Sequence, residues 1–98
     1  TIATEFEKHY QKEQNPERKK QILGYLIDYK DLTLLMNWKA QRNEELWKYS
    51  YNAYKKLASF SLVEYLSSDF NLALKKKNFL QNLPTNLGYK IFRKRFGN

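Results

Sequence analysis

Hydrophobic side chains recur every three or four residues along most of the chain, which is the spacing of one buried helix face. The clearest case follows Asn15-Pro16, a typical helix start. Its apolar positions form two adjoining stripes: Ile22, Leu26 and Tyr29 on one, and Leu23 with Ile27 on the other. Ahead of it, residues 4–14 predict a thinly hydrophobic first helix that Thr4 can cap.

The middle of the chain allows two arrangements. Asp31 or Thr33 can cap a new helix, and Asn43 offers another start just before two glutamates. Residues 32–58 therefore form either one long helix or two helices with a break near Asn43. Two neighbouring stripes from residue 46 onward are predicted to face the core: Leu46, Ala53 and Leu57 on one, and Trp47, Tyr51, Tyr54 and Ala58 on the other.

Further helix signals continue to the end of the chain. Ser61 and Glu64 match a capping box. Ser68 or Asp69 can cap a helix that ends at Pro84 and carries Phe70, Leu74, Phe79, Leu80 and Leu83. Thr85 can then open a last segment.

Strand-like alternation is confined to residues 87–91, which are too few to predict a sheet. We therefore expect a single domain, residues 1–98, with an all-α fold. The predicted architecture is a compact bundle of about five helices that closes with a basic, aromatic C-terminal helix.

The amino-acid composition indicates the cellular compartment in which the protein works. The chain has no cysteine, so it offers neither a disulfide nor a thiolate metal ligand, which suits an intracellular, reducing compartment such as the cytoplasm or an organelle interior. No apolar run approaches the roughly 20 residues that cross a bilayer. The first ten residues lack a signal-peptide pattern. We expect a soluble chain without a transmembrane segment.

Charge is segregated along the chain, whose formal net charge is +8. Residues 1–69 contain eleven cations and all ten acids, whereas residues 70–98 contain seven cations and no acid. Such segregation creates a local field that attracts polyanions and acidic surfaces.

Catalytic motifs are lacking. The sequence has no cysteine nucleophile, no glycine-rich phosphate loop and only one histidine. Glu5, His9 and Glu13 fall at successive i, i+4 positions and could bind a transition metal, but such rows arise by chance on solvated helices. We expect no enzyme activity, no metal site and no cofactor.

The aromatic residues between Trp47 and Lys56 have two interpretations. Next to lysines they could stack nucleic-acid bases, but Trp47, Tyr51 and Tyr54 lie at core spacing, which favours packing. Tyr49 points away from that stripe and is predicted to be an exposed contact.

The cations of the C-terminal third are the remaining candidate binding residues. Tyr89, Phe92 and Phe96 share one helix face, so this segment either docks its aromatics on the bundle or becomes ordered only on a partner. Arg93 and Arg95 could grip phosphates bidentately. With Tyr49, the predicted binding residues are Lys75, Lys76, Lys77, Lys90, Arg93, Lys94 and Arg95.

The leading functional hypothesis is a non-enzymatic binding module whose basic C-terminal third contacts a polyanion, most directly a nucleic-acid backbone. An anionic membrane surface is another partner for such a segment. The alternative is a protein-interaction module that recognises an acidic protein surface as an adaptor, an accessory subunit or an immunity- or inhibitor-type bundle.

Overall fold

The computed structural model describes residues 2–41, 43–59 and 71–96. These residues contain five helices: α1 (Ile2–Lys12), α2 (Pro16–Gln41), α3 (Glu44–Lys55), α5 (Leu72–Gln81) and α6 (Thr85–Phe96). The predicted all-α bundle of about five helices is confirmed. None of the helices in the described ranges is both long and apolar enough to cross a membrane.

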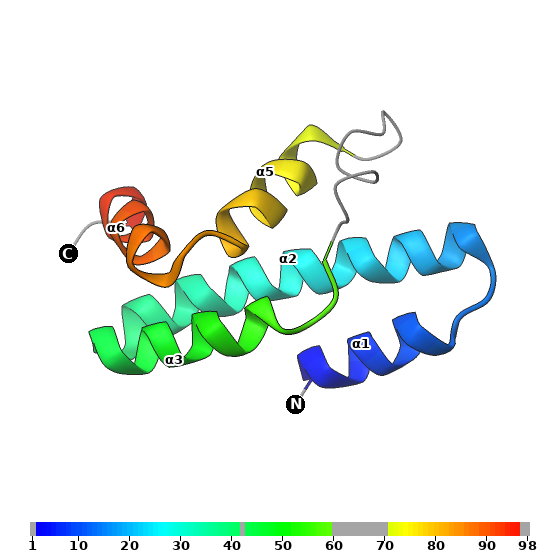
Figure 1. Ribbon diagram of the computed structural model, residues 1–98, viewed down its shortest axis with the longest axis horizontal. Helices are drawn as coiled ribbons and strands as arrows, with labels where there is room; N and C mark the ends of the chain where they lie inside the picture. The colour runs from blue at the N-terminus through cyan, green and yellow to red at the C-terminus, as the bar shows by residue number, and fades with distance from the viewer. Residues whose placement is uncertain (1, 42, 60–70, 97–98) are drawn as a thin grey trace.

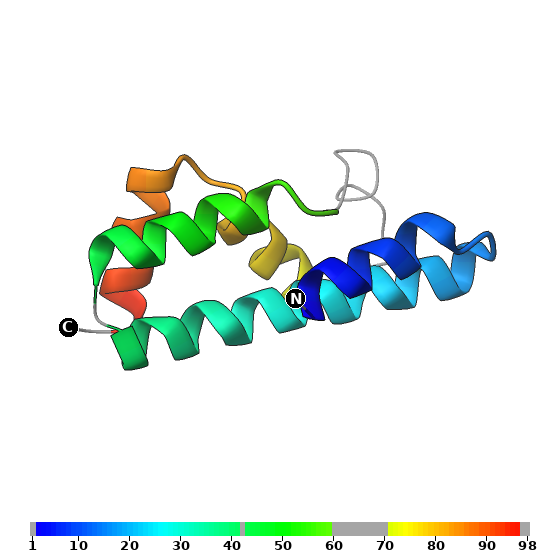
Figure 2. The same cartoon turned by 90° about the horizontal axis from the view of Figure 1, so that it is seen from below.

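Helix α2 is the longest element, with 26 residues, and the other helices pack around it. Helix α1 runs antiparallel along its first half, and α3 returns along its second half (Figure 1). Helices α1, α2 and α3 form one layer, and α5 and α6 lie together on one side of it. Helix α6 runs across the direction of α2 (Figure 2). The C-terminal third therefore forms a second layer on the bundle.

Three asparagines cap the helices at their N-terminal ends. The Oδ1 atom of Asn15 accepts from the backbone N–H groups of Glu17 and Arg18, as predicted for the start of α2. Asn43 caps α3 in the same way, and Asn71 caps α5. Each side-chain oxygen satisfies backbone donors that the first helical turn leaves open.

Some predicted helix starts are wrong, and others lie outside the described residues. Helix α1 already begins at Ile2, so Thr4 lies inside it and does not cap it. Residues 31 and 33 do not begin a helix, because α2 continues unbroken from Pro16 to Gln41. The Thr33 hydroxyl instead donates to the carbonyl oxygen of Tyr29 one turn earlier (2.8 Å), so it supports the helix interior. The capping box at 61–64, the caps proposed at 68 and 69 and the core position 70 lie outside the described residues.

An aromatic cluster fills the space between α2, α3 and α6. Trp47, Tyr51 and Phe92 are fully buried, and Trp38, Tyr89 and Phe96 pack against them. The predicted core role is confirmed for Trp47 and Tyr51, whereas Tyr54 and Ala58 of the same stripe are half-buried. The Trp47 Nε1 atom donates to the carbonyl oxygen of Leu34 (3.1 Å). The neighbouring stripe is not buried throughout, because Leu46 and Ala53 are exposed on α3. A single helix of a two-layer bundle buries only the face that meets its neighbours.

A second cluster joins α1 to the first half of α2. Ala3, Leu23, Leu26 and Ile27 are its buried members, and Leu74 of α5 packs against it. This contact and the aromatic cluster hold α5 and α6 on the bundle and determine which of their faces point outward.

Candidate polyanion-binding surface

Helix α6 docks on the bundle through its aromatic face. Phe92 and Gly88 are buried, and Tyr89 and Phe96 are half-buried. The last segment of the chain is therefore an amphipathic closing helix, which was one of the two arrangements that its sequence allowed. Its basic residues occupy the remainder of the helix circumference.

A tight approach at Gly88 positions the start of α6. A Cβ atom at this residue would lie 2.6 Å from Cζ of Tyr51, so only glycine fits against the tyrosine ring. The Tyr51 hydroxyl donates to the carbonyl oxygen of Leu80 (2.6 Å) and accepts from the backbone N–H of Leu83 (2.9 Å). Tyr51 thus fixes the end of α5 and the beginning of α6 together.

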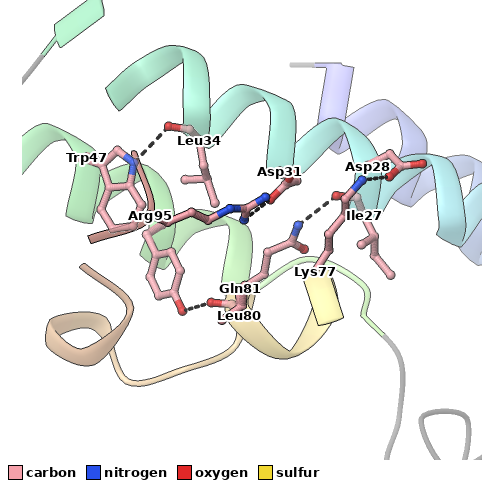
Figure 3. Close-up of polar contacts among 10 residues, drawn as sticks. Ile27, Asp28, Asp31, Leu34, Trp47, Lys77, Leu80, Gln81 and Arg95 are labelled. Carbon is pink, nitrogen blue, oxygen red and sulfur yellow. Dashed lines mark hydrogen bonds and ion pairs between the residues drawn. The ribbon is translucent and has the colours of Figure 1, made fainter. Parts of the chain in front are cut away.

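Two of the seven predicted cations are paired with acids of α2. The Nζ atom of Lys77 lies 2.7 Å from Oδ1 of Asp28, and Nη1 of Arg95 lies 3.5 Å from Oδ1 of Asp31 (Figure 3). Between these pairs, Gln81 Nε2 donates to the carbonyl oxygen of Ile27 (2.9 Å). The inward edges of α5 and α6 are therefore tied to one stretch of α2.

Arg95 is held on two sides. Besides its ion pair, its guanidinium lies 5.0 Å from the ring centroid of Phe96 and 5.9 Å from that of Phe92. A stacked guanidinium that also meets a carboxylate has fewer donors left for a phosphate. Arg95 and Lys77 therefore serve to attach α5 and α6 to α2 more than to contact a phosphate.

The outer face of α5 combines lysines with large apolar side chains. Lys76 is exposed, and Lys75 beside it is half-buried. Leu72 and Phe79 flank them at i−4 and i+3 from Lys76, with exposed fractions of 81% and 53%. These four residues lie within two turns, so cationic and apolar groups alternate on this face.

The outer face of α6 has the same character. Lys90 and Lys94 are exposed one turn apart, opposite the buried Phe92, and Leu87 precedes Lys90 by three residues with an exposed fraction of 45%. We define the α5–α6 outer surface by the residues of these two faces: Leu72, Lys75, Lys76, Phe79, Leu87, Lys90 and Lys94.

An acidic group marks the edge of this surface toward α3. Hydrogen bonds from Lys48 and then Tyr89 lower the pKa of Glu44, and the positive charge of Arg93 adds to the effect. The Lys48 Nζ atom lies 2.9 Å from Glu44 Oε2, and this bond raises the pKa of Lys48. Arg93 is exposed but lies within the field of Glu44, so it borders the α5–α6 outer surface.

Tyr49 is exposed, as predicted, but it belongs to another part of the molecule. Its exposed fraction is 75%, on the face of α3 that points away from the buried Trp47 and Tyr51. Leu46, one turn earlier, is also exposed. Tyr49 therefore groups with an apolar neighbour on α3.

The row of Glu5, His9 and Glu13, which runs along α1 to just past its end, shows no metal geometry. Glu5 pairs with Lys8 (3.6 Å), and Oε1 of Glu13 accepts from the backbone N–H of Asn15. Within the described ranges, no three His, Asp or Glu residues are grouped as metal ligands would be.

Lys30 is a buried lysine whose ammonium is hydrogen-bonded inside the protein. The Nζ atom of Lys30 donates to the carbonyl oxygen of Ala58 (3.0 Å), and Oε2 of Glu7 accepts from the N–H of the same residue (2.6 Å). Burial lowers the pKa of Lys30 to about 8, against the opposing charge of Glu7. This arrangement fastens the segment after α3 to α1 and α2.

Comparisons with models of protein families, with curated proteins and with solved structures found no match to this chain.

Sequence reasoning did not foresee the partners of Lys77 and Arg95 or the outward leucines. It assigned Asp31 to a helix start, whereas Asp31 lies in the interior of α2, one turn after Asp28. Leu72, Leu74, Phe79 and Leu80 are spread around the α5 circumference, and this spread was the available signal that some apolar residues must face outward.

Proposed function

We propose that this protein is a non-enzymatic binding module whose α5–α6 outer surface contacts the phosphate groups of a polyanion, with a nucleic-acid backbone as the most direct candidate. The observation that carries the proposal is the docking of α6. Because its aromatic face is covered by α2 and α3, the exposed lysines form a fixed cationic surface on a folded layer.

The charge distribution supports the same proposal. Neither α5 nor α6 contains an acid, and two aspartates of α2 neutralise only the inward-facing Lys77 and Arg95. The outward lysines have no ion-pair partner in the described part of the chain. Lysines of this kind act as point charges, so the binding would depend on phosphate density more than on base sequence.

An intracellular, reducing setting belongs to this proposal, since the sequence has no cysteine that must be oxidised.

The test is a fluorescence anisotropy titration of labelled DNA, RNA and inorganic polyphosphate at several salt concentrations. The test variant carries Lys76→Ala, Lys90→Ala and Lys94→Ala. A matched control carries Lys12→Ala, Lys39→Ala and Lys56→Ala, which remove the same charge from exposed positions elsewhere.

We expect the test variant to bind at least about tenfold more weakly at low salt, and its salt slope to fall by about one for each lysine that contacts a phosphate. The control should retain most of the affinity. Equal losses in both variants would show that only net charge matters, and no binding by the wild type at low salt would refute the proposal.

A second candidate function rests on α3. Tyr49 and Leu46 are exposed at i, i+3 spacing, and aromatic residues are enriched where protein interfaces concentrate their binding energy. A protein partner held there would bind with little salt dependence and would be lost on Tyr49→Ala substitution, while polyanion binding would persist.

A further inference from the structure

The apolar residues of the α5–α6 outer surface identify its ligand more narrowly than its charge does. Single exposed hydrophobic residues are common on protein surfaces. Here three large ones are interleaved with lysines on two helices that contain no acid, and both helices lie on the same side of α2 (Figures 1 and 2).

We propose that this surface binds the face of an anionic lipid bilayer, with Leu72, Phe79 and Leu87 entering the interface and the lysines meeting the phosphate headgroups. This inference rests on the proposed function, because the same lysines supply the electrostatic attraction.

The two leucines distinguish a bilayer from a nucleic acid. Phe79 could stack on a base, but Leu72 and Leu87 have no π face and gain nothing from a phosphate backbone. In the boundary between headgroups and acyl chains, by contrast, an apolar side chain leaves water while a neighbouring lysine keeps its ammonium at the headgroups.

The choice of cation agrees with a bilayer. The α5–α6 outer surface contains four lysines and no arginine: the exposed Arg93 lies at its border in the field of Glu44, and Arg95 is stacked on Phe96 and paired with Asp31. Lysine gives little geometric selectivity among phosphates, which suits a fluid array of headgroups.

The register of each helix puts its exposed apolar and cationic groups on one face. Leu72, Lys76 and Phe79 occupy i, i+4 and i+7 of α5, and Leu87, Lys90 and Lys94 occupy i, i+3 and i+7 of α6. Each set lies on one helix face, and each face is opposite a buried residue, Gln81 in α5 and Phe92 in α6.

The experiment is co-sedimentation with phosphatidylcholine vesicles that contain or lack phosphatidylglycerol, run beside anisotropy titrations with DNA and polyphosphate. The test variant carries Leu72→Gln, Phe79→Gln and Leu87→Gln, which keep every charge. The matched control carries Leu32→Gln, Met36→Gln and Leu46→Gln, three exposed apolar positions on α2 and α3. Urea unfolding verifies that both variants fold.

We expect the wild type to bind phosphatidylglycerol vesicles, and the test variant to lose at least about tenfold in vesicle affinity. Its affinity for polyphosphate should stay unchanged, and the control should behave as the wild type in both assays.

Equal vesicle binding by the wild type and the test variant would overturn the membrane inference. So would binding to DNA without binding to vesicles, which would leave a nucleic-acid module. In both cases the proposed polyanion function would stand, whereas absence of binding to all of these probes would refute both.

Discussion

The backbone of Gly88 approaches the ring of Tyr51 so closely that an added Cβ atom would lie 2.6 Å from Cζ. Tyr51 is fully buried and its hydroxyl is engaged by Leu80 and Leu83, so the ring has no free direction in which to move. This contact joins the two helices that carry the α5–α6 outer surface to α3.

The substitution Gly88→Ala should therefore destabilise the protein. Alanine is favoured over glycine within a helix by about 1 kcal/mol, but the clash with Tyr51 adds an overpacking cost of about 1–3 kcal/mol, and we expect the clash to prevail. Gly24→Ala is the control, since its Cβ would lie 3.4 Å from the flexible Cδ1 end of Leu74. Urea unfolding should show a lower midpoint for Gly88→Ala and an unchanged or higher one for Gly24→Ala. A stabilised Gly88→Ala variant would contradict the close contact.

Removing the Tyr51 hydroxyl should also lower stability. In Tyr51→Phe, the backbone N–H of Leu83 and the carbonyl oxygen of Leu80 lose a buried partner, which costs about 1–3 kcal/mol. Tyr49→Phe removes the same atom at an exposed position and should change the free energy of unfolding by less than about 0.5 kcal/mol. Similar effects of the two substitutions in urea unfolding would show that the buried hydrogen bonds contribute nothing.

Stability should rise when the pH increases from 8 toward 10. Burial lowers the pKa of Lys30 to about 8, below its ordinary value of 10.5, so the unfolded chain binds this proton more tightly than the folded protein does. The cost of burying the Lys30 ammonium is fully present below pH 8 and declines as the pH rises. The free energy of unfolding should therefore increase by about 1–2 kcal/mol by pH 9.5. Above pH 10 a second group opposes this gain. Burial raises the pKa of Tyr51 to about 12, so the hydroxyl ionises in the unfolded chain before it does in the folded protein, and the free energy of unfolding falls as the pH rises.

The measurement is urea unfolding at pH 7.5, 8.5 and 9.5, compared with Lys30→Met, which replaces the ammonium with an unbranched apolar chain. The variant should lose the upward slope. An identical slope in both proteins would assign the pH dependence to another group.

Replacing the two aspartates that pair with the C-terminal layer should strengthen polyanion binding. In Asp28→Asn with Asp31→Asn, Lys77 and Arg95 lose their acidic partners. Both ion pairs are at least partly exposed, so we expect a stability loss below about 1 kcal/mol for each. The salt slope of DNA binding should steepen by about 0.9 for each released cation that reaches a phosphate.

The matched control for that double variant is Glu5→Gln with Glu17→Gln, which makes the same charge change on α1 and at the start of α2. Anisotropy titrations at several salt concentrations should show a larger gain for the aspartate variant. Equal gains would mean that Lys77 and Arg95 do not reach the polyanion even when they are released.

Helix positions could be predicted from the sequence where a cap and an apolar stripe agree. Asn15-Pro16 and Asn43 both begin helices, and Trp47 and Tyr51 of the predicted stripe are buried. Asp31 and Thr33 misled the prediction because a good capping residue is also tolerated inside a helix when its side chain has another partner, as Arg95 and Tyr29 provide here.

The candidate surface could be predicted only in part. Charge segregation pointed to the C-terminal cations, but sequence periodicity cannot tell which of them meet an acid from a helix about 50 residues away, as Lys77 meets Asp28. Nor could it assign Leu72 and Leu87 to the outer face, because that assignment depends on which sides of α5 and α6 the other helices cover.

The most direct test of the central claim is to map polyphosphate binding on the protein by two-dimensional amide NMR of the uniformly ¹⁵N-labelled chain. A titration at low salt should shift the amide signals of α5 and α6 around Lys76, Lys90 and Lys94, while those around His9 and Tyr49 stay in place. Shifts that concentrate on α1 or α3, or that spread evenly over all exposed lysines, would contradict a binding surface on the C-terminal helices.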